Sequence, residues 1–268
     1  MSGFLIALFW VIFSKYVFDV LFFREAKIER EIFGNKNLAL SLSYAGYFLG
    51  LAFSFYSVYF YESLFREVLY LIFVSFTLLL GVYIFDLIFL RKIDLKEEIL
   101  RGNAGAGITQ GIYFLSLGIL ISASFWRKES FILSVIYSLI YLSLGMVMLF
   151  ISTLLMSRLL KLNFEEEVKK ENFSASLVLG SITLGVSVVL YGAISGEFMG
   201  SLIFDLFSTV LYFVVSQVLM VIFYVVVEFL LFRKVILSSE VYENNLSASL
   251  ILSATFIASA FITLAVMG

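Results

Sequence analysis

Four polar residues occupy equivalent places in four hydrophobic stretches, each five residues before an arginine that ends its stretch: Asp19, Asp86, Thr153 and Glu228. Five helical residues span about 7.5 Å, so we expect these side chains just inside the hydrocarbon of a membrane, where an ionisable group is costly and marks a candidate functional site. Three carboxylates and a hydroxyl at one depth could form an acidic ring for cations. Alternatively, each carboxylate reaches the interface or pairs with a cation, as Lys15 would pair with Asp19 one helical turn away.

Composition limits the chemistry that these residues can do. The chain has neither Cys nor His, which excludes disulfides, thiolate chemistry, haem or iron–sulfur ligation by these residues and a histidine proton relay. No nucleophile–base pair or metal-ligand cluster stands out. Gln110 and Gln217, which also lie in hydrophobic stretches, are predicted to make interhelical hydrogen bonds rather than a substrate site. We therefore expect no enzyme activity, no catalytic residue, no metal and no cofactor.

The elements that must position the four polar residues are membrane helices. The chain is 62% hydrophobic and 14% charged, and apolar stretches longer than about 18 residues recur along it. Eight spans are predicted, at residues 4–23, 38–61, 68–90, 104–126, 131–156, 173–195, 206–232 and 246–267. The expected fold class is an all-α integral membrane protein.

The basic residues indicate how these helices are oriented. The four odd-numbered loops hold 14 of the 18 Lys and Arg residues and the even-numbered loops hold Arg66, Arg127 and Lys128, which predicts odd loops in the cytoplasm, both termini outside and a location in a bacterial inner membrane. The odd loops alternate charged with apolar residues, and Asp94 has a capping-box partner three residues on, as does Asn163. Short amphipathic helices at the interface are therefore predicted there. The net charge of −2 gives no indication of nucleic-acid binding.

An asparagine followed by small residues occurs four times. Gly, Ala or Ser stands 2, 4, 8, 13 and 15 residues after each of Asn37, Asn103, Asn172 and Asn245. Each asparagine is predicted to be the N-cap of its helix. The small residues four and eight positions later are predicted to pack against neighbouring helices; they are Ser41, Ala45, Gly107, Gly111, Ser176, Gly180, Ser249 and Ser253. The chain is thus expected to contain four parallel two-helix repeats.

This recurring pattern resembles the bacterial YjfL-type inner-membrane proteins, also called domain of unknown function family 350. The motifs that carry the resemblance are Asn37-Leu38-Ala39-Leu40-Ser41, Asn103-Ala104-Gly105-Ala106-Gly107, Asn172-Phe173-Ser174-Ala175-Ser176 and Asn245-Leu246-Ser247-Ala248-Ser249. The resemblance implies two tandem four-helix domains, residues 1–130 and 131–268, with two repeats in each. It implies no settled activity.

Three classes of function remain for such a chain, and an intramembrane enzyme is the least favoured of them because no nucleophile–base pair or metal-ligand cluster is evident. The first expectation is a cation-permeable channel or carrier, whose acidic ring lies near the cytoplasmic side. The alternative is a non-transport membrane scaffold that organises lipids or partner proteins, for example in envelope stress. The expected partners are membrane lipids, cations and either a second copy or another membrane protein.

Overall fold

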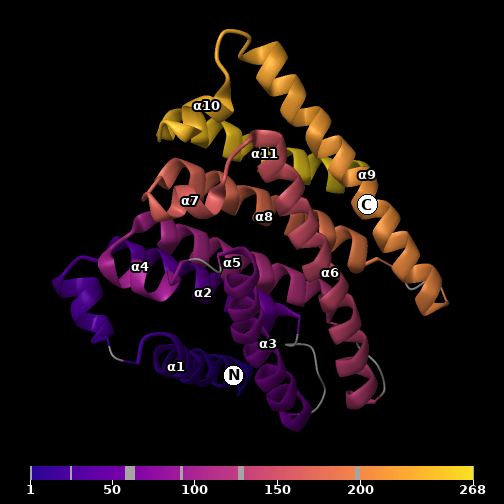
Figure 1. Cartoon of the computed structure of the whole chain (residues 1–268). Coiled ribbons are helices and arrows are strands. Elements are labelled where there is room, and N and C mark those ends of the chain that lie inside the picture. The colour runs from indigo at the N-terminus through magenta and orange to yellow at the C-terminus, as the bar shows by residue number, and fades with distance from the viewer. Residues whose placement is uncertain are drawn as a thin grey trace. The chain divides into compact units, whose positions relative to one another are not determined.

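The computed structural model describes residues 2–24, 26–57, 64–90, 93–125, 130–196 and 200–267, which form helices and turns and no strand (Figure 1). Seven helices in these ranges are long and apolar enough to cross a membrane. The chain is therefore an all-helical, multi-pass membrane protein. The first helix is not among the seven, so the eighth predicted span stays a prediction. The chain divides into two compact units, Met1–Ser122 and Ala123–Gly268.

Unit 1 twice follows the order long helix, short helical segment, long helix. Its first half contains α1 (Ser2–Phe22), a π-helical turn η1 (Arg30–Gly34) and α2 (Leu38–Tyr56). Its second half contains α3 (Leu64–Phe89), α4 (Leu95–Arg101) and α5 (Ala104–Ser124). Phe18 is fully buried between α1, α2 and α5, with its ring stacked 4.4 Å from that of Tyr47 and edge-on to Phe114 at 5.3 Å. An aromatic cluster thus forms the core of this unit.

Unit 2 has the same order of long and short helices, with one π-helical turn added in its second half. It contains α6 (Phe131–Leu160), α7 (Phe164–Lys169) and α8 (Phe173–Ile194), followed by α9 (Leu202–Val226), the π-helical turn η2 (Val227–Leu231), α10 (Leu237–Tyr242) and α11 (Leu246–Met267). Most residues of α8 are buried, and α8 contacts α6, α9 and α11. It is therefore the central helix of unit 2. The α9 helix starts four residues earlier than the predicted span, in agreement with the apolar run that precedes Leu206.

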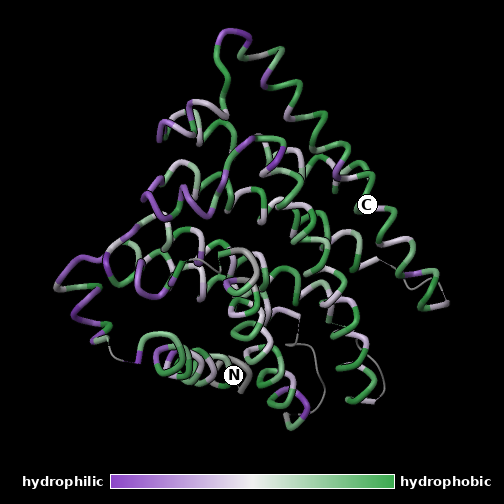
Figure 2. The backbone as a smooth tube through the Cα atoms, in the orientation of Figure 1, coloured by the Kyte–Doolittle hydropathy of each residue, from purple (hydrophilic) through white to green (hydrophobic). Residues whose placement is uncertain are grey.

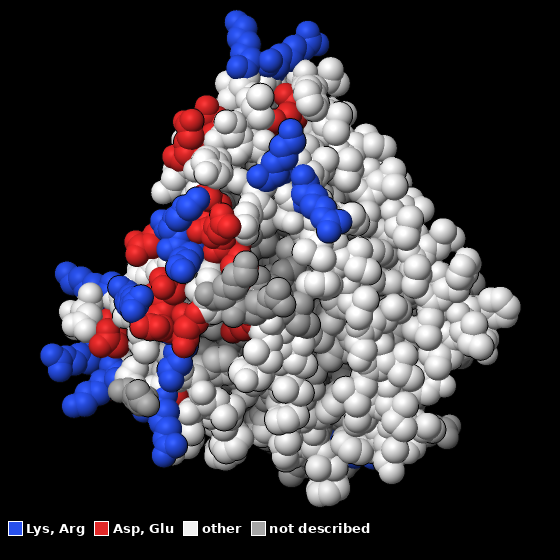
Figure 3. All heavy atoms as spheres, in the orientation of Figure 1, with Lys and Arg blue, Asp and Glu red and all other residues white. Residues whose placement is uncertain are grey.

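The predicted short amphipathic helices are confirmed in three of the four loops. The Asp94 carboxylate accepts the Glu97 N–H at 3.1 Å and the Asn163 side chain accepts the Glu166 N–H at 3.4 Å, which starts α4 and α7. Each short helix buries two apolar residues, which are Leu95 and Ile99, Phe164 and Val168, and Leu237 and Val241. Figure 2 shows that the long helices are mostly hydrophobic. Charged side chains gather over the short helices (Figure 3).

Candidate functional site

The four recurring asparagines each stand directly before a long helix, which is α2, α5, α8 or α11. Their Oδ1 atoms accept backbone N–H groups three residues later, from Leu40 at 3.0 Å, Ala106 at 3.0 Å, Ala175 at 2.9 Å and Ala248 at 3.3 Å. Each such bond satisfies a donor that has no partner inside the helix. The side-chain oxygen of each asparagine is therefore in the N-cap position predicted for it.

Two of these asparagines also bond to the segment that precedes the next recurring asparagine of the chain. Asn37 Nδ2 donates to the backbone carbonyls of Ile99 and Leu100 at 2.9 and 3.3 Å. Asn172 Nδ2 donates in the same way to Val241 and Tyr242, both at 3.1 Å. In both units, the acceptors are the residues four and three positions before the next repeated asparagine. Sequence reasoning missed this second role, although a capping Asn always leaves its NH₂ group for another acceptor.

The α2 and α5 helices touch backbone to backbone through glycines. A Cβ atom built on Gly107 would lie 2.2 Å from the carbonyl oxygen of Ala39, and one built on Gly118 would lie 2.2 Å from that of Gly50. From the other side, a Cβ on Gly46 would lie 2.0 Å from the carbonyl oxygen of Gly111. Only glycine fits at such a seam, since any other side chain would overlap main-chain atoms.

The α8 and α11 helices meet in the same register in unit 2. Gly185 stands thirteen residues after its asparagine, as Gly50 does in unit 1. A Cβ on Gly185 would lie 3.0 Å from the Phe256 carbonyl oxygen and 3.4 Å from Ala260 Cβ. The approach is looser than in unit 1, where Gly118 takes the place of this alanine. The two units therefore share one packing pattern.

The other predicted packing residues divide between buried and exposed. Ser176, Gly180, Ser249 and Ser253 are buried. Ser41 is half-buried and donates to the Asn37 carbonyl, and Ala45 is exposed. On α2 the close contact uses Gly46 and Gly50 in place of Ser41 and Ala45, because a different face of this helix turns toward α5.

The acidic residues of unit 1 have different surroundings. Lys15 Nζ lies 2.7 Å from Asp19 Oδ2, the contact that the ion-pair interpretation expects, and the Tyr44 hydroxyl donates to the other oxygen. Gln110 hydrogen-bonds Asp86, whose Oδ1 is buried and finds no hydrogen-bond partner among the described residues. Asp19 and Asp86 line separate cavities. They therefore do not share one polar site within unit 1.

The equivalent residues of unit 2 bond locally. Thr153 Oγ1 donates to the carbonyl of Leu149 at 2.9 Å, in its own helix. Glu228 lies in the π-helical turn η2, a type of turn frequent at functional sites. Its Oε1 accepts the N–H of Leu237 at 3.1 Å, while Oε2 is buried and unpartnered within the described ranges. Glu228 thus ties the end of α9 to the start of α10.

Both glutamines make the interhelical hydrogen bonds predicted for them. Ser43 of α2 donates to Gln110 of α5, and Ser152 of α6 donates to Gln217 of α9. Sequence analysis missed a further polar contact, between the Tyr141 hydroxyl and the buried carboxylate of Asp205. The apolar run around Asp205 was the available signal, since it places this carboxylate inside a hydrophobic helix.

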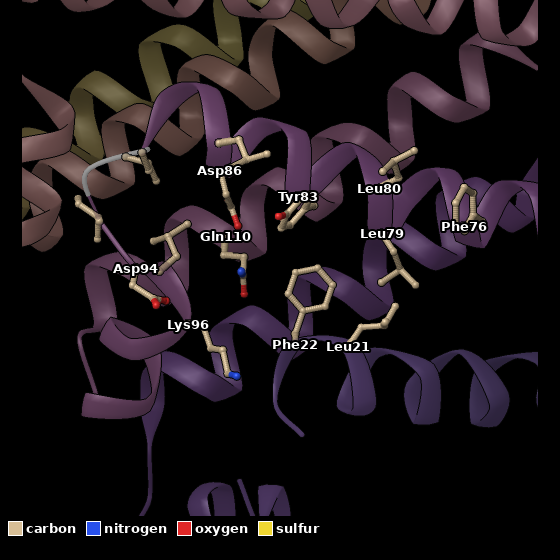
Figure 4. A pocket seen from close by; sticks show the side chains of 14 residues that line it. Leu21, Phe22, Phe76, Leu79, Leu80, Tyr83, Asp86, Asp94, Lys96 and Gln110 are labelled. Atoms are coloured by element: carbon tan, nitrogen blue, oxygen red, sulfur yellow. The ribbon is translucent and has the colours of Figure 1, made fainter. Parts of the chain in front are cut away.

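A cavity of about 740 Å³ lies between α1, α3, α4 and α5 of unit 1. Figure 4 shows Asp86 and Gln110 beside one another at one end, with Asp94 and Lys96 on the same side, and Phe76, Leu79 and Leu80 at the other end. No group of three acidic residues that could hold a metal ion occurs in the part of the chain that the structure describes. The cavity therefore has one polar and one apolar end.

The family model of Domain of Unknown Function (DUF350) matches the chain twice, at residues 1–125 and 130–267. The chain belongs to the DUF350 family. The two matches agree with the predicted tandem copies, and they cover one structural unit each, apart from a few residues at the boundary. No solved structure matches this DUF350 protein.

Proposed function

We propose that this DUF350 protein is a non-transport membrane scaffold, in which two tandem units form rigid bodies that organise lipids or partner proteins. The observation that carries the proposal is the separation of Asp19 and Asp86 into two cavities with different partners. A cation pathway needs such groups to line one conduit. Backbone contact between α2 and α5 further supports a rigid unit. The same contact leaves no room for an ion passage between these two helices.

Ion flux tests this proposal. Proteoliposomes that contain the wild-type chain should pass K⁺ and Na⁺ no faster than protein-free liposomes at any voltage or pH. The matched variant carries Asp19→Asn, Asp86→Asn and Glu228→Gln, which keep side-chain size and hydrogen-bonding capacity. Wild-type flux above that of protein-free liposomes would overturn the scaffold proposal, and a fall in this variant would assign the flux to the acidic residues.

Cation permeation is the second candidate. Asp86 and Glu228 favour it, since each has a buried carboxylate oxygen without a hydrogen-bond partner in the described residues. Such an oxygen is costly unless something binds it. Flux that depends on Asp86 and Glu228 but not on Asp19 would support this candidate.

We further propose eight spans in four parallel repeats, with both termini outside the inner membrane. The proposal rests on the basic loops and on α1 as the first span. Because the chain has no Cys, single cysteines report topology directly. Cysteines at Lys36, Arg101, Lys170 and Arg233 should be shielded from an impermeant thiol reagent in intact cells. A cysteine at Arg66 is the control and should be labelled; the reverse pattern would invert the topology.

A further inference from the structure

We propose that the cavity of unit 1 binds a phospholipid with a primary ammonium headgroup, such as phosphatidylethanolamine. The ammonium would lie beside Asp86 and the phosphate near Lys96, with one acyl chain leaving along α3. This inference adds a defined ligand site to the scaffold and does not depend on whether ions cross the protein.

The polarity of the cavity follows the polarity of a lipid. Phe76 precedes Asp86 by ten residues on α3, which corresponds to about 15 Å along the helix axis. Asp86 lies near the end of α3, close to the interfacial helix α4, and Phe76 lies toward the middle of the span. Polar groups at the interface and apolar groups below it match the order of headgroup and chain in a lipid (Figure 4).

The apolar end of the cavity is open to the surface of the helices. Phe76 is 64% exposed and Leu21 is 62% exposed, although both line the cavity. In a membrane such side chains face hydrocarbon, so an acyl chain can enter without leaving the bilayer. The volume of about 740 Å³ lies within the range of about 300–1,000 Å³ that is usual for small-molecule sites. This volume is sufficient for a lipid headgroup and the upper part of one acyl chain.

Charge selects the headgroup. The buried Oδ1 of Asp86 lacks a hydrogen-bond donor within the described residues, and an ammonium carries three N–H donors. Asp94 already caps α4 but adds negative charge nearby. Among the described residues that line the cavity, Lys96 is the basic one, and its ammonium group can bind a phosphate. A headgroup with both charges satisfies Asp86 and Lys96 together, whereas an anionic headgroup would lie against Asp86.

Native mass spectrometry of the purified, delipidated full-length chain tests the site. Phosphatidylethanolamine, phosphatidylcholine and phosphatidylglycerol with identical acyl chains are titrated separately. We expect phosphatidylethanolamine to bind at least about tenfold more tightly than phosphatidylcholine, whose quaternary ammonium cannot donate a hydrogen bond. Equal retention of the three lipids would overturn the proposal.

Variants locate the binding within the cavity. Asp86→Asn and Lys96→Gln should each weaken phosphatidylethanolamine binding about tenfold. The control is Glu97→Gln, because Glu97 lies on α4 but is exposed and pairs with Arg101 at 2.5 Å; it should bind like wild type. If Asp86→Asn fails to fold, Leu80→Trp serves instead, since it fills the apolar end and leaves every charge in place. If Asp86→Asn, Lys96→Gln and Leu80→Trp all bind the lipid as tightly as wild type, the lipid does not bind in this cavity and the proposal is wrong.

Two further experiments test whether something other than a phospholipid occupies the cavity. Free phosphoethanolamine, which has no acyl chains, should not displace the lipid; displacement would show that the headgroup alone binds and would overturn the proposal of a lipid ligand. A dimer that dissociates on Leu80→Trp, without any lipid selectivity, would assign the cavity to a second copy and overturn the proposal. The lipid experiment measures retention of lipid, whereas the scaffold proposal is tested by ion flux. A negative lipid result therefore does not contradict the scaffold, and a positive flux result does not contradict the lipid site.

Discussion

Replacing Gly118 with alanine is expected to destabilise unit 1 by at least the upper part of the range of about 1–3 kcal/mol typical of an overpacked core. The new Cβ would lie 2.2 Å from the carbonyl oxygen of Gly50 and 2.5 Å from its Cα. These are main-chain atoms and cannot rotate away, so α2 and α5 must separate along their length. Gly107→Ala should behave alike, because its Cβ would meet Ala39 at the same distances. Thermal unfolding in detergent measures both losses.

The matched control is Gly81→Ala on α3. Its Cβ would lie 3.1 Å from Leu117 Cδ1, the end of a flexible side chain. Leu117 can shift by a few tenths of an ångström, and alanine is favoured over glycine in helices by about 1 kcal/mol. The control should therefore be close to neutral. Equal melting temperatures for Gly118→Ala, Gly81→Ala and wild type would refute the backbone contact between α2 and α5.

Asn172→Ala is expected to lower the free energy of unfolding by about 2–4 kcal/mol. Loss of an N-cap costs about 1 kcal/mol, and each lost buried hydrogen bond adds about 0.5–1.5 kcal/mol. Asn172 caps α8, donates to the carbonyls of Val241 and Tyr242, and donates to the buried Glu167 at 2.8 Å. Its removal thus frees one end of α8 and detaches α10. Denaturant or thermal unfolding reports the loss.

Asn245→Ala is the control for this effect. Asn245 is exposed, accepts the N–H groups of Ser247 and Ala248, and donates to Glu240. Its replacement should cost about 1 kcal/mol, as for an ordinary cap. If Asn172→Ala and Asn245→Ala lose the same stability, the bonds from Asn172 to the short helix contribute nothing.

The separate surroundings of the aligned acids change how these positions are interpreted. Asp19 has a cation and a tyrosine hydroxyl as partners, whereas Asp86 faces a cavity that is apolar at its far end. The same position of the sequence pattern therefore has two different environments within unit 1. The lipid site proposed at Asp86 and the ion pair of Asp19 fit this difference better than an acidic ring does.

The sequence by itself determined the features that depend on neighbours within a few residues. Apolar runs predicted the membrane helices, and the spacing after Asp94 and Asn163 predicted two short helices. The N-cap position of each repeated asparagine followed from its place before an apolar run, because a cap bonds only to the next turn of its own helix. The recurring arginine five residues later placed Asp19, Asp86, Thr153 and Glu228 near one end of their predicted spans.

Only the tertiary structure decided which distant segments meet. The sequence marked Ser41 and Ala45 as packing residues of α2, but the contact with α5 uses Gly46 and Gly50 and leaves Ala45 exposed. Likewise, the spacing gave no sign that Asn37 reaches Ile99 or that Asp86 lines a cavity with Lys96. Helical periodicity assigns residues to a face, whereas the partner of that face depends on how several helices pack at once.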